Sequence, residues 1–191
     1  MNSDVNRAAA LFDGMNLYHH ARNAFGDRDG GYDPVKLART IAKSQGCELV
    51  QTRFYVGVPP PNRHRRLHGY WQARLHAMEE NGVFVFRGAV NYAGDQGQEK
   101  GVDIRIGLDS IQLVLDEICD TLIIFSTDQD FKQIRPTAIN VAKRLGTKVR
   151  MKSAFPRTDR YSVRGIDGTD WIPFGREIYA ASIDPTNYWP K

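Results

Sequence analysis

The chain has 191 residues, of which 41% are hydrophobic and 25% are charged, and its formal net charge is +4. This length and balance fit one folded domain and exclude a largely disordered chain. No apolar run is long enough to cross a bilayer, so we expect no membrane-spanning helix.

The first predicted strand is the short apolar run at residues 8–12, which stops at Asp13 and Gly14. A run this short and wholly apolar is typical of a strand buried in a parallel sheet. Apolar residues at helical spacing follow over residues 15–24. Because open α/β sheets bind ligands at the carboxyl ends of their strands, we expect Asp13 to lie at such an edge.

The rest of the chain alternates between helices and strands, with a breaker-rich turn at residues 26–31. Helices are predicted over residues 34–45, 63–80, 102–118 and 128–145, and strands over residues 48–58, 83–86, 121–125 and 148–151. Pro136 should kink the last of these helices. Residues 87–101 are polar and glycine-rich, which predicts a mobile loop over the sheet edge. The alternation predicts an α/β fold with about five mostly parallel strands and helices on both faces.

The strand and helix pattern fails after residue 154. We therefore divide the chain into a domain over residues 1–154 and an appendage, packed on that domain, over residues 155–191. One short helix is predicted in the appendage, at residues 176–181. Its aromatic side chains have three open explanations, namely core cover, a dimer contact or a stacking surface for bases, and core cover is the preferred one.

Acidic or amide side chains follow two of the predicted strands, those at residues 8–12 and 121–125. Asp13 could be only the N-cap of the next helix, with Asn16 an ordinary first-turn residue. Thr127 and Asp130 have the spacing of a capping box, in which Asp128 would be a first-turn acid favoured by the helix dipole. The residues alone leave the structural and the ligand interpretations open.

The helix predicted from residue 102 carries a stronger signal. Asp109 falls on the apolar stripe of this helix, where an unpaired carboxylate needs a cation, a donor or a water-filled cleft. Asp103 lies in the first turn and is rotated by about a third of a revolution from Asp109. We therefore rank Asp103 ahead of Asp109 as a direct metal ligand.

A parallel sheet can bring these three acid-bearing junctions to one edge. Oxygen ligands without nearby His or Cys suit a hard ion, Mg²⁺ or Mn²⁺, that keeps several waters. Such an ion can polarise a phosphodiester and activate water. His64 and His68 have helical spacing but no accompanying acid, so we expect a solvated face there and no zinc site.

Basic residues gather in two stretches, residues 63–76 and 143–164. Basic clusters beside carboxylates fit a polyanionic partner. Arg63, Arg65 and Arg66, together with Arg87 or Lys100, are predicted to hold backbone phosphates of a nucleic acid. The alternative for the arginine run is a solvated helix face.

Three stretches in order resemble the motifs of the NYN domain, in its LabA-like branch of the PIN-like nucleases. They are Phe12-Asp13-Gly14-Met15-Asn16-Leu17, Lys100-Gly101-Val102-Asp103 with Asp109 following, and Ser126-Thr127-Asp128-Gln129-Asp130-Phe131. The resemblance covers about residues 8–151 and implies a PIN-like three-layer α/β/α sandwich that cleaves RNA with a metal ion. It implies that Asp13, Asn16, Asp103 and Asp128 surround the metal. Asp109 and Asp130 match further acidic positions.

One departure from the family is visible. The third motif usually reads Ser-Gly-Asp-Ser-Asp-Phe, and here Thr127 and Gln129 replace the Gly and the second Ser. The acids survive, so metal binding is still expected. A β-branched residue at the Gly position could alter how the backbone approaches a phosphate, which leaves turnover less secure than binding.

The leading hypothesis is a Mg²⁺- or Mn²⁺-dependent endoribonuclease that acts on single-stranded RNA. The alternative is a non-catalytic nucleic-acid-binding or regulatory module. A phosphatase is disfavoured because Asp13 lacks a second Asp two residues later. The polar start of the chain and the spacing of Cys47 and Cys119 indicate a reduced, cytoplasmic protein, whereas the sequence leaves a homodimer open.

Overall fold

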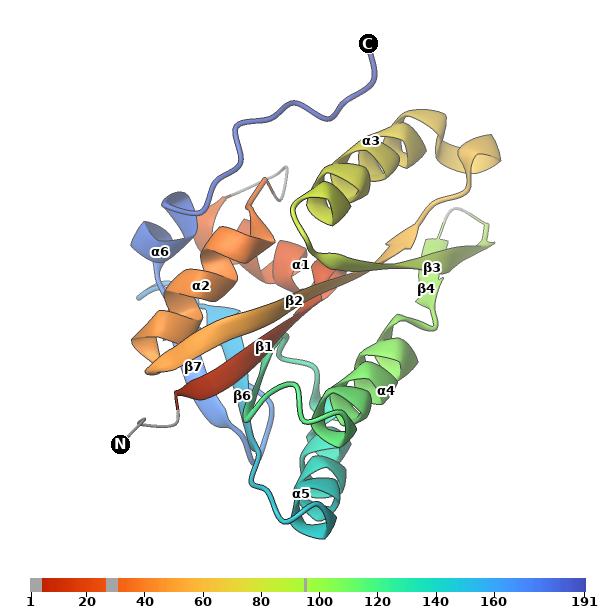
Figure 1. The fold of residues 1–191 in the computed structure, drawn as a ribbon. Helices are drawn as coiled ribbons and strands as arrows, with labels where there is room; N and C mark the ends of the chain where they lie inside the picture. The colour runs from red at the N-terminus through yellow and green to blue at the C-terminus, as the bar shows by residue number, and fades with distance from the viewer. Residues whose placement is uncertain (1–4, 27–30, 95) are drawn as a thin grey trace.

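The computed structural model describes residues 5–26, 31–94 and 96–191, so most of the turn predicted at residues 26–31 lies outside the described residues. The elements in chain order are β1 (Asn6–Asp13), α1 (Gly14–Phe25), α2 (Pro34–Ser44), β2 (Cys47–Val58), α3 (Pro61–Glu80), β3 (Phe84–Ala93), β4 (Gln96–Lys100), α4 (Val102–Leu115), β5 (Thr121–Phe125), the 3₁₀ helix η1 (Gln129–Gln133), α5 (Ile134–Arg144), β6 (Arg150–Pro156), β7 (Asp170–Phe174) and α6 (Arg176–Ala180). Figure 1 shows this arrangement.

The strands form one sheet of seven in the order β4-β3-β2-β1-β5-β6-β7. All neighbours are parallel except β3 and β4, which are antiparallel. Strand β1 lies at the centre, and its apolar residues are fully buried, alternating between the cores on the two faces. This confirms the prediction that residues 8–12 form a parallel strand buried on both sides.

Helices cover both faces of the sheet, as Figure 1 shows. The core on one face includes residues of α1, α2, α3 and α6, and the core on the other includes residues of α4 and α5. The fold is therefore the expected three-layer α/β/α sandwich. It has seven strands where about five were predicted.

The prediction of a mobile loop over residues 87–101 was wrong. Residues up to Ala93 continue β3, and β4 pairs back against them in an antiparallel hairpin at the edge of the sheet. The hairpin is largely exposed, so its sequence lacks the apolar face that marks strands in the interior. Backbone pairing holds it instead, and its packing leaves little room for a side chain at Gly88 or Gly97.

The C-terminal part of the chain adds to the same sheet. β6 continues to Pro156, so the predicted boundary at residue 154 falls inside a strand. β7 pairs in parallel with β6, and Ile172 and Phe174 lie in the core with Phe25. The short helix predicted at residues 176–181 is present as α6.

Pro136 does not kink a long helix as predicted. Residues 129–133 form the 3₁₀ helix η1, and α5 begins at Ile134, so Pro136 lies in the first turn of α5. Proline is tolerated there because the first N–H groups of a helix have no intrahelical partner. Elsewhere α4 ends at Leu115, three residues earlier than predicted, and Glu117 after it has a φ of 52°.

The carboxyl ends of the parallel strands and the starts of the helices that follow them lie together along one side of the sheet, called the acidic edge below. Phe12 is paired with Phe125, so the ends of β1 and β5 lie level with each other; Asp13 is paired with Tyr55, and β2 continues beyond it to Val58. The start of α4 joins them because Lys100 pairs with Ala89 at the end of the hairpin. Across the described ranges, no helix is long and apolar enough to cross a membrane.

Candidate acidic site

Asp13 is the buried centre of this edge, with only 5% of its surface exposed. It caps α1: the backbone N–H of Asn16 donates to Asp13 Oδ1 at 3.2 Å, and the Ser126 hydroxyl donates to Asp13 Oδ2 at 3.1 Å. Burial raises the pKa of Asp13 from 3.8 to about 7, against the effect of these two hydrogen bonds. Negative charge on Glu99 and Asp103 raises it further.

The residue after Asp13 must be glycine because neighbouring atoms of β2 leave no room for a side chain at Gly14. A Cβ atom at this position would lie 2.8 Å from the carbonyl oxygen of Tyr55 and 2.9 Å from the ring of Phe54. Helix α1 therefore starts in direct contact with β2, which fixes Asp13 at the end of its strand. The Asp-Gly pair follows from this close approach and from the capping bond.

Asp103 lies exposed in the first turn of α4. Its pKa is raised first by partial desolvation and then by the negative charges of Asp128 and Asp130. Asp103 in turn raises the pKa of Asp13. The structure thus brings acids from all three junctions into electrostatic contact.

Asp128 is the N-cap of η1. Its Oδ1 accepts the backbone N–H of Asp130 at 2.9 Å, and its own N–H donates to Ser126 Oγ at 3.1 Å. The capping-box alternative with Thr127 as the cap is therefore wrong. Ser126 joins the two junctions, because its hydroxyl also donates to Asp13.

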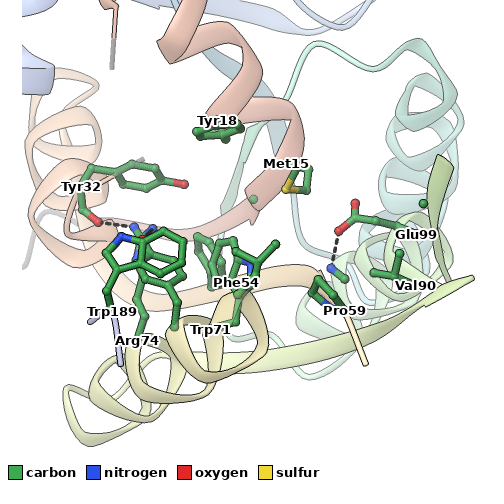
Figure 2. Close-up of a pocket in the computed structure, with 15 residues that line it drawn as sticks. Met15, Tyr18, Tyr32, Phe54, Pro59, Trp71, Arg74, Val90, Glu99 and Trp189 are labelled. Atoms are coloured by element: carbon green, nitrogen blue, oxygen red, sulfur yellow. Dashed lines mark hydrogen bonds between the residues drawn. The ribbon is translucent and has the colours of Figure 1, made fainter. Parts of the chain in front are cut away.

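Glu99 is a member of this acidic group that the sequence analysis missed. It lies on β4 and accepts a hydrogen bond from the backbone N–H of Gly57, shown as a dashed line in Figure 2. A Cβ at Gly57 would lie 2.6 Å from Glu99 Oε1, so only glycine leaves room for this contact. Burial and the charge of Asp103 raise the pKa of Glu99. The exposed hairpin gave no periodic signal that could have identified it.

Asp109 is engaged elsewhere. Its Oδ1 accepts from Arg105 at 2.9 Å, and its Oδ2 accepts from the Tyr55 hydroxyl at 2.9 Å and from Arg53 at 3.0 Å. These are the donors that a carboxylate on an apolar stripe requires. Asp109 is not among the charges that raise the pKa of Asp13, Glu99 or Asp103.

The predicted phosphate-binding residues differ in their surroundings. Arg63, Arg65 and Arg66 are exposed on the first turns of α3. Arg87 forms a bidentate ion pair with Glu79, at 2.6 and 2.8 Å. Lys100 Nζ donates to Gln98 at 2.7 Å and is otherwise exposed.

Thr127, one of the two departures from the family motif, links the acidic edge to the C-terminal part of the chain. Its backbone N–H donates to Asn16 Oδ1 at 3.1 Å, and its hydroxyl lies 2.7 Å from His20 Nε2. The other ring nitrogen of His20 lies 2.6 Å from the Tyr161 hydroxyl. Burial lowers the pKa of His20. The sequence analysis gave no role to His20 or Tyr161.

Gln129, the second departure from the family motif, forms hydrogen bonds to the C-terminal part of the chain. Its side-chain amide donates to the carbonyl of Gly165 at 3.0 Å, and its oxygen accepts the N–H of Asp167 at 3.0 Å. A serine is too short to make both bonds from this position. Of the two residues that differ from the motif, Gln129 therefore binds the C-terminal segment directly, and Thr127 is connected to it through His20.

The donor set of the site is made of oxygen atoms, which suits Mg²⁺ or Mn²⁺. Within the described part of the chain, no three His, Cys, Asp or Glu side chains are close enough together to hold an ion. Mg²⁺ commonly binds through one or two carboxylates and keeps several waters, and this arrangement fits that mode. Burial first, and nearby negative charge second, raise the pKa values of Asp13, Glu99 and Asp103, so a bound cation would offset the cost of ionising these carboxylates.

Comparison with known proteins gave a family and a fold. The sequence matches the NYN domain over residues 7–160. A crystal structure of a protein of unknown function from Vibrio parahaemolyticus is similar, with a TM-score of 0.58 and 20% sequence identity, over 93% of this chain and 98% of that one. No match was found among curated proteins.

Proposed function

The chain belongs to the NYN domain family, and from that premise we propose that it is a metal-dependent endoribonuclease of the LabA-like branch. The observation that carries the proposal is the acidic edge, where, in addition to burial, Glu99 and Asp103 raise the pKa of Asp13, and Asp128 and Asp130 raise the pKa of Asp103. Such clusters of mutually repelling carboxylates are typical of functional sites, because repulsion lowers stability unless a ligand offsets it.

We assign the ion, Mg²⁺ or Mn²⁺, to the edge formed by Asp13, Asp103 and Asp128. One or two of these carboxylates would bind it directly and the others would act through its water ligands, with Glu99 and Asp130 adding negative charge around it. When bound, the ion would polarise the scissile phosphodiester and lower the pKa of a water molecule. We leave Asp109 out of this set because three donors already occupy its carboxylate.

The uncharged residues of the edge keep the acids in place. Asn16 accepts the Thr127 N–H and so connects the first turn of α1 to the segment that follows β5. Ser126 bonds to the Asp13 carboxylate and to the N–H of Asp128. These bonds orient two acids before any ligand arrives, which reduces the reorganisation that the reaction requires.

Single-stranded RNA is the proposed substrate, held through its phosphates by Arg63, Arg65 and Arg66. Their guanidinium groups are exposed at the start of α3. Lys100 is a further candidate, because it immediately precedes the turn into α4, where Asp103 lies. Arg87 is held by Glu79 and would have to exchange partners to contact a phosphate.

The test is cleavage of a mixed-sequence single-stranded RNA with Mn²⁺, Mg²⁺ or EDTA. We expect cleavage that requires metal and is lost in Asp13→Asn and in Asp103→Asn. Asp120→Asn is the matched control, because Asp120 pairs with Arg7 beside the start of β1. Cleavage that persists in both edge variants would refute the assignment of the site.

The second candidate function is a non-catalytic RNA-binding or regulatory module. It is favoured by the side chains of Thr127 and Gln129, which are bound to His20 and to the C-terminal segment. Salt-dependent RNA binding without cleavage in any metal would support this function. Thr127→Gly would then be the first variant to test for recovered cleavage.

A further inference from the structure

A cavity of about 320 Å³ lies beside the acidic edge and is lined by α1, β2, α3, the β3–β4 hairpin and the C-terminal tail. Figure 2 shows it with Glu99 and Pro59 at one end and with Tyr32, Arg74 and Trp189 at the other. Its volume is at the lower end of the range for small-molecule sites.

The walls of the cavity are mainly aromatic. Six rings line it, and they are Tyr18, Tyr32, Phe54, Tyr70, Trp71 and Trp189. Trp189, from the C-terminal tail, packs on Tyr70 with ring centroids 4.6 Å apart. Flat aromatic walls around a space of this size suit a flat ligand that stacks.

Arg74 makes the far wall rigid. It belongs to the basic stretch of the sequence, yet it is buried, donating to the Tyr70 hydroxyl at 3.0 Å and to the Tyr32 carbonyl at 2.9 Å. Its guanidinium lies within 6.0 Å of the ring centres of Tyr32, Tyr70 and Trp71. The positive charge therefore lies within the aromatic wall. There it attracts the π electrons of these rings, which favours their stacking with an electron-rich ligand.

The cavity and the acidic edge share residues. Gly14, which lines the cavity, directly follows Asp13, and Glu99 belongs to both sites. A ligand in the cavity would thus lie beside the proposed cleavage point. The exposed arginines Arg65 and Arg66 are on the same helix, α3, whose inner face lines the cavity.

We propose that this cavity binds one unstacked nucleobase of single-stranded RNA, next to the phosphate that is to be cleaved. The inference rests on the proposed function, because it takes RNA as the ligand of the acidic edge. Proteins that recognise single-stranded RNA splay bases out and stack them on aromatic side chains. Here the walls would select an unpaired nucleotide, since a base within a duplex cannot enter.

The tryptophans allow a direct binding test. The chain has three, Trp71, Trp171 and Trp189, and only the first and the last line the cavity. In the Trp171→Phe variant, all tryptophan fluorescence therefore comes from the cavity. We expect a single-stranded RNA hexamer to quench it in EDTA, where no cleavage occurs, and the same hexamer with abasic sites throughout to bind without quenching.

Truncation of the walls tests the energetics. Tyr18→Ala and Trp189→Ala should each weaken binding of the intact hexamer roughly tenfold, the usual effect of removing one stacking ring. Trp171→Ala is the matched control, because Trp171 and Trp189 have similar exposure, 44% and 41%, and Trp171 lies on β7. The abasic hexamer should bind the native protein and all three variants equally.

Three results would overturn the proposal: no quenching on RNA binding, equal affinity for intact and abasic hexamers, or quenching by a free nucleoside monophosphate as strong as by the hexamer. The last would assign the cavity to a soluble nucleotide. Quenching without cleavage in any metal would refute the nuclease and leave the cavity assignment standing. If cleavage depends on metal, is unchanged in Tyr18→Ala and occurs without quenching, the nuclease stands and the cavity assignment is refuted.

Discussion

Replacing Asp13 with asparagine should make the folded protein more stable at neutral pH while it removes the central acid of the site. Burial raises the pKa of Asp13 from 3.8 to about 7 in the folded state. The folded protein therefore disfavours the ionised carboxylate, and stability falls as the pH rises through the interval between these two values. Asparagine carries no charge and escapes this penalty.

The size of the effect follows from the interval. About three pH units at about 1.4 kcal/mol each give an upper limit of about 4 kcal/mol for the penalty at pH 8. Asparagine still accepts the Asn16 N–H, because Asn and Asp are equally good N-caps. It loses the charged acceptor for the Ser126 hydroxyl, a bond worth about 1.5–3 kcal/mol, so we expect a net gain of roughly 1–2 kcal/mol.

The assay is urea unfolding followed by circular dichroism, in EDTA, at several pH values. Below a pH of about 4, Asp13 is protonated in both states and the variant should have no advantage; the advantage should grow up to a pH of about 7 and then level off. A stability difference between variant and native protein that does not change with pH would refute the reasoning. Asp120→Asn should behave in the opposite way, losing stability above a pH of about 4, because the hydrogen bond from Arg7 lowers the pKa of Asp120.

Three further predictions follow from the same structure. Mg²⁺ or Mn²⁺ should raise the melting temperature of the native protein in thermal unfolding and leave Asp13→Asn unchanged, because the ion stabilises only the state that binds it; an equal rise in both would place the ion elsewhere. Gly14→Ala should lower the free energy of unfolding in urea by about 1–3 kcal/mol, since its Cβ would overlap the Tyr55 carbonyl. Gly107→Ala on α4, where a Cβ would meet open space, should instead raise it by about 0.5–1 kcal/mol, and a loss of stability there would contradict the packing argument. Arg63→Gln should reduce the slope of log affinity for RNA against log salt by about 1, and an unchanged slope in a filter-binding titration would mean that this arginine contacts no phosphate.

The sequence by itself determined the centre of this fold. The apolar run that becomes β1 is too short for a helix and wholly apolar, and a central parallel strand is the element that buries such a run on both faces. The acids at positions 13, 103 and 128 could be placed at strand–helix junctions because the local pattern ends beside each of them. The NYN motifs were recognisable for the same reason, since each lies within one short stretch of chain.

Tertiary structure alone decided what each polar group contacts. Glu99 reaches the acidic edge because an exposed hairpin pairs through its backbone, which leaves no periodic side-chain pattern to detect. In the sequence, Asp109 looks like a metal ligand and Arg74 belongs to a basic stretch. In the structure, Asp109 is bound by arginine donors and Arg74 is packed among aromatic rings. Burial and partner choice depend on residues far apart in the chain. Local periodicity therefore predicted the elements but could not predict the contacts that complete the site.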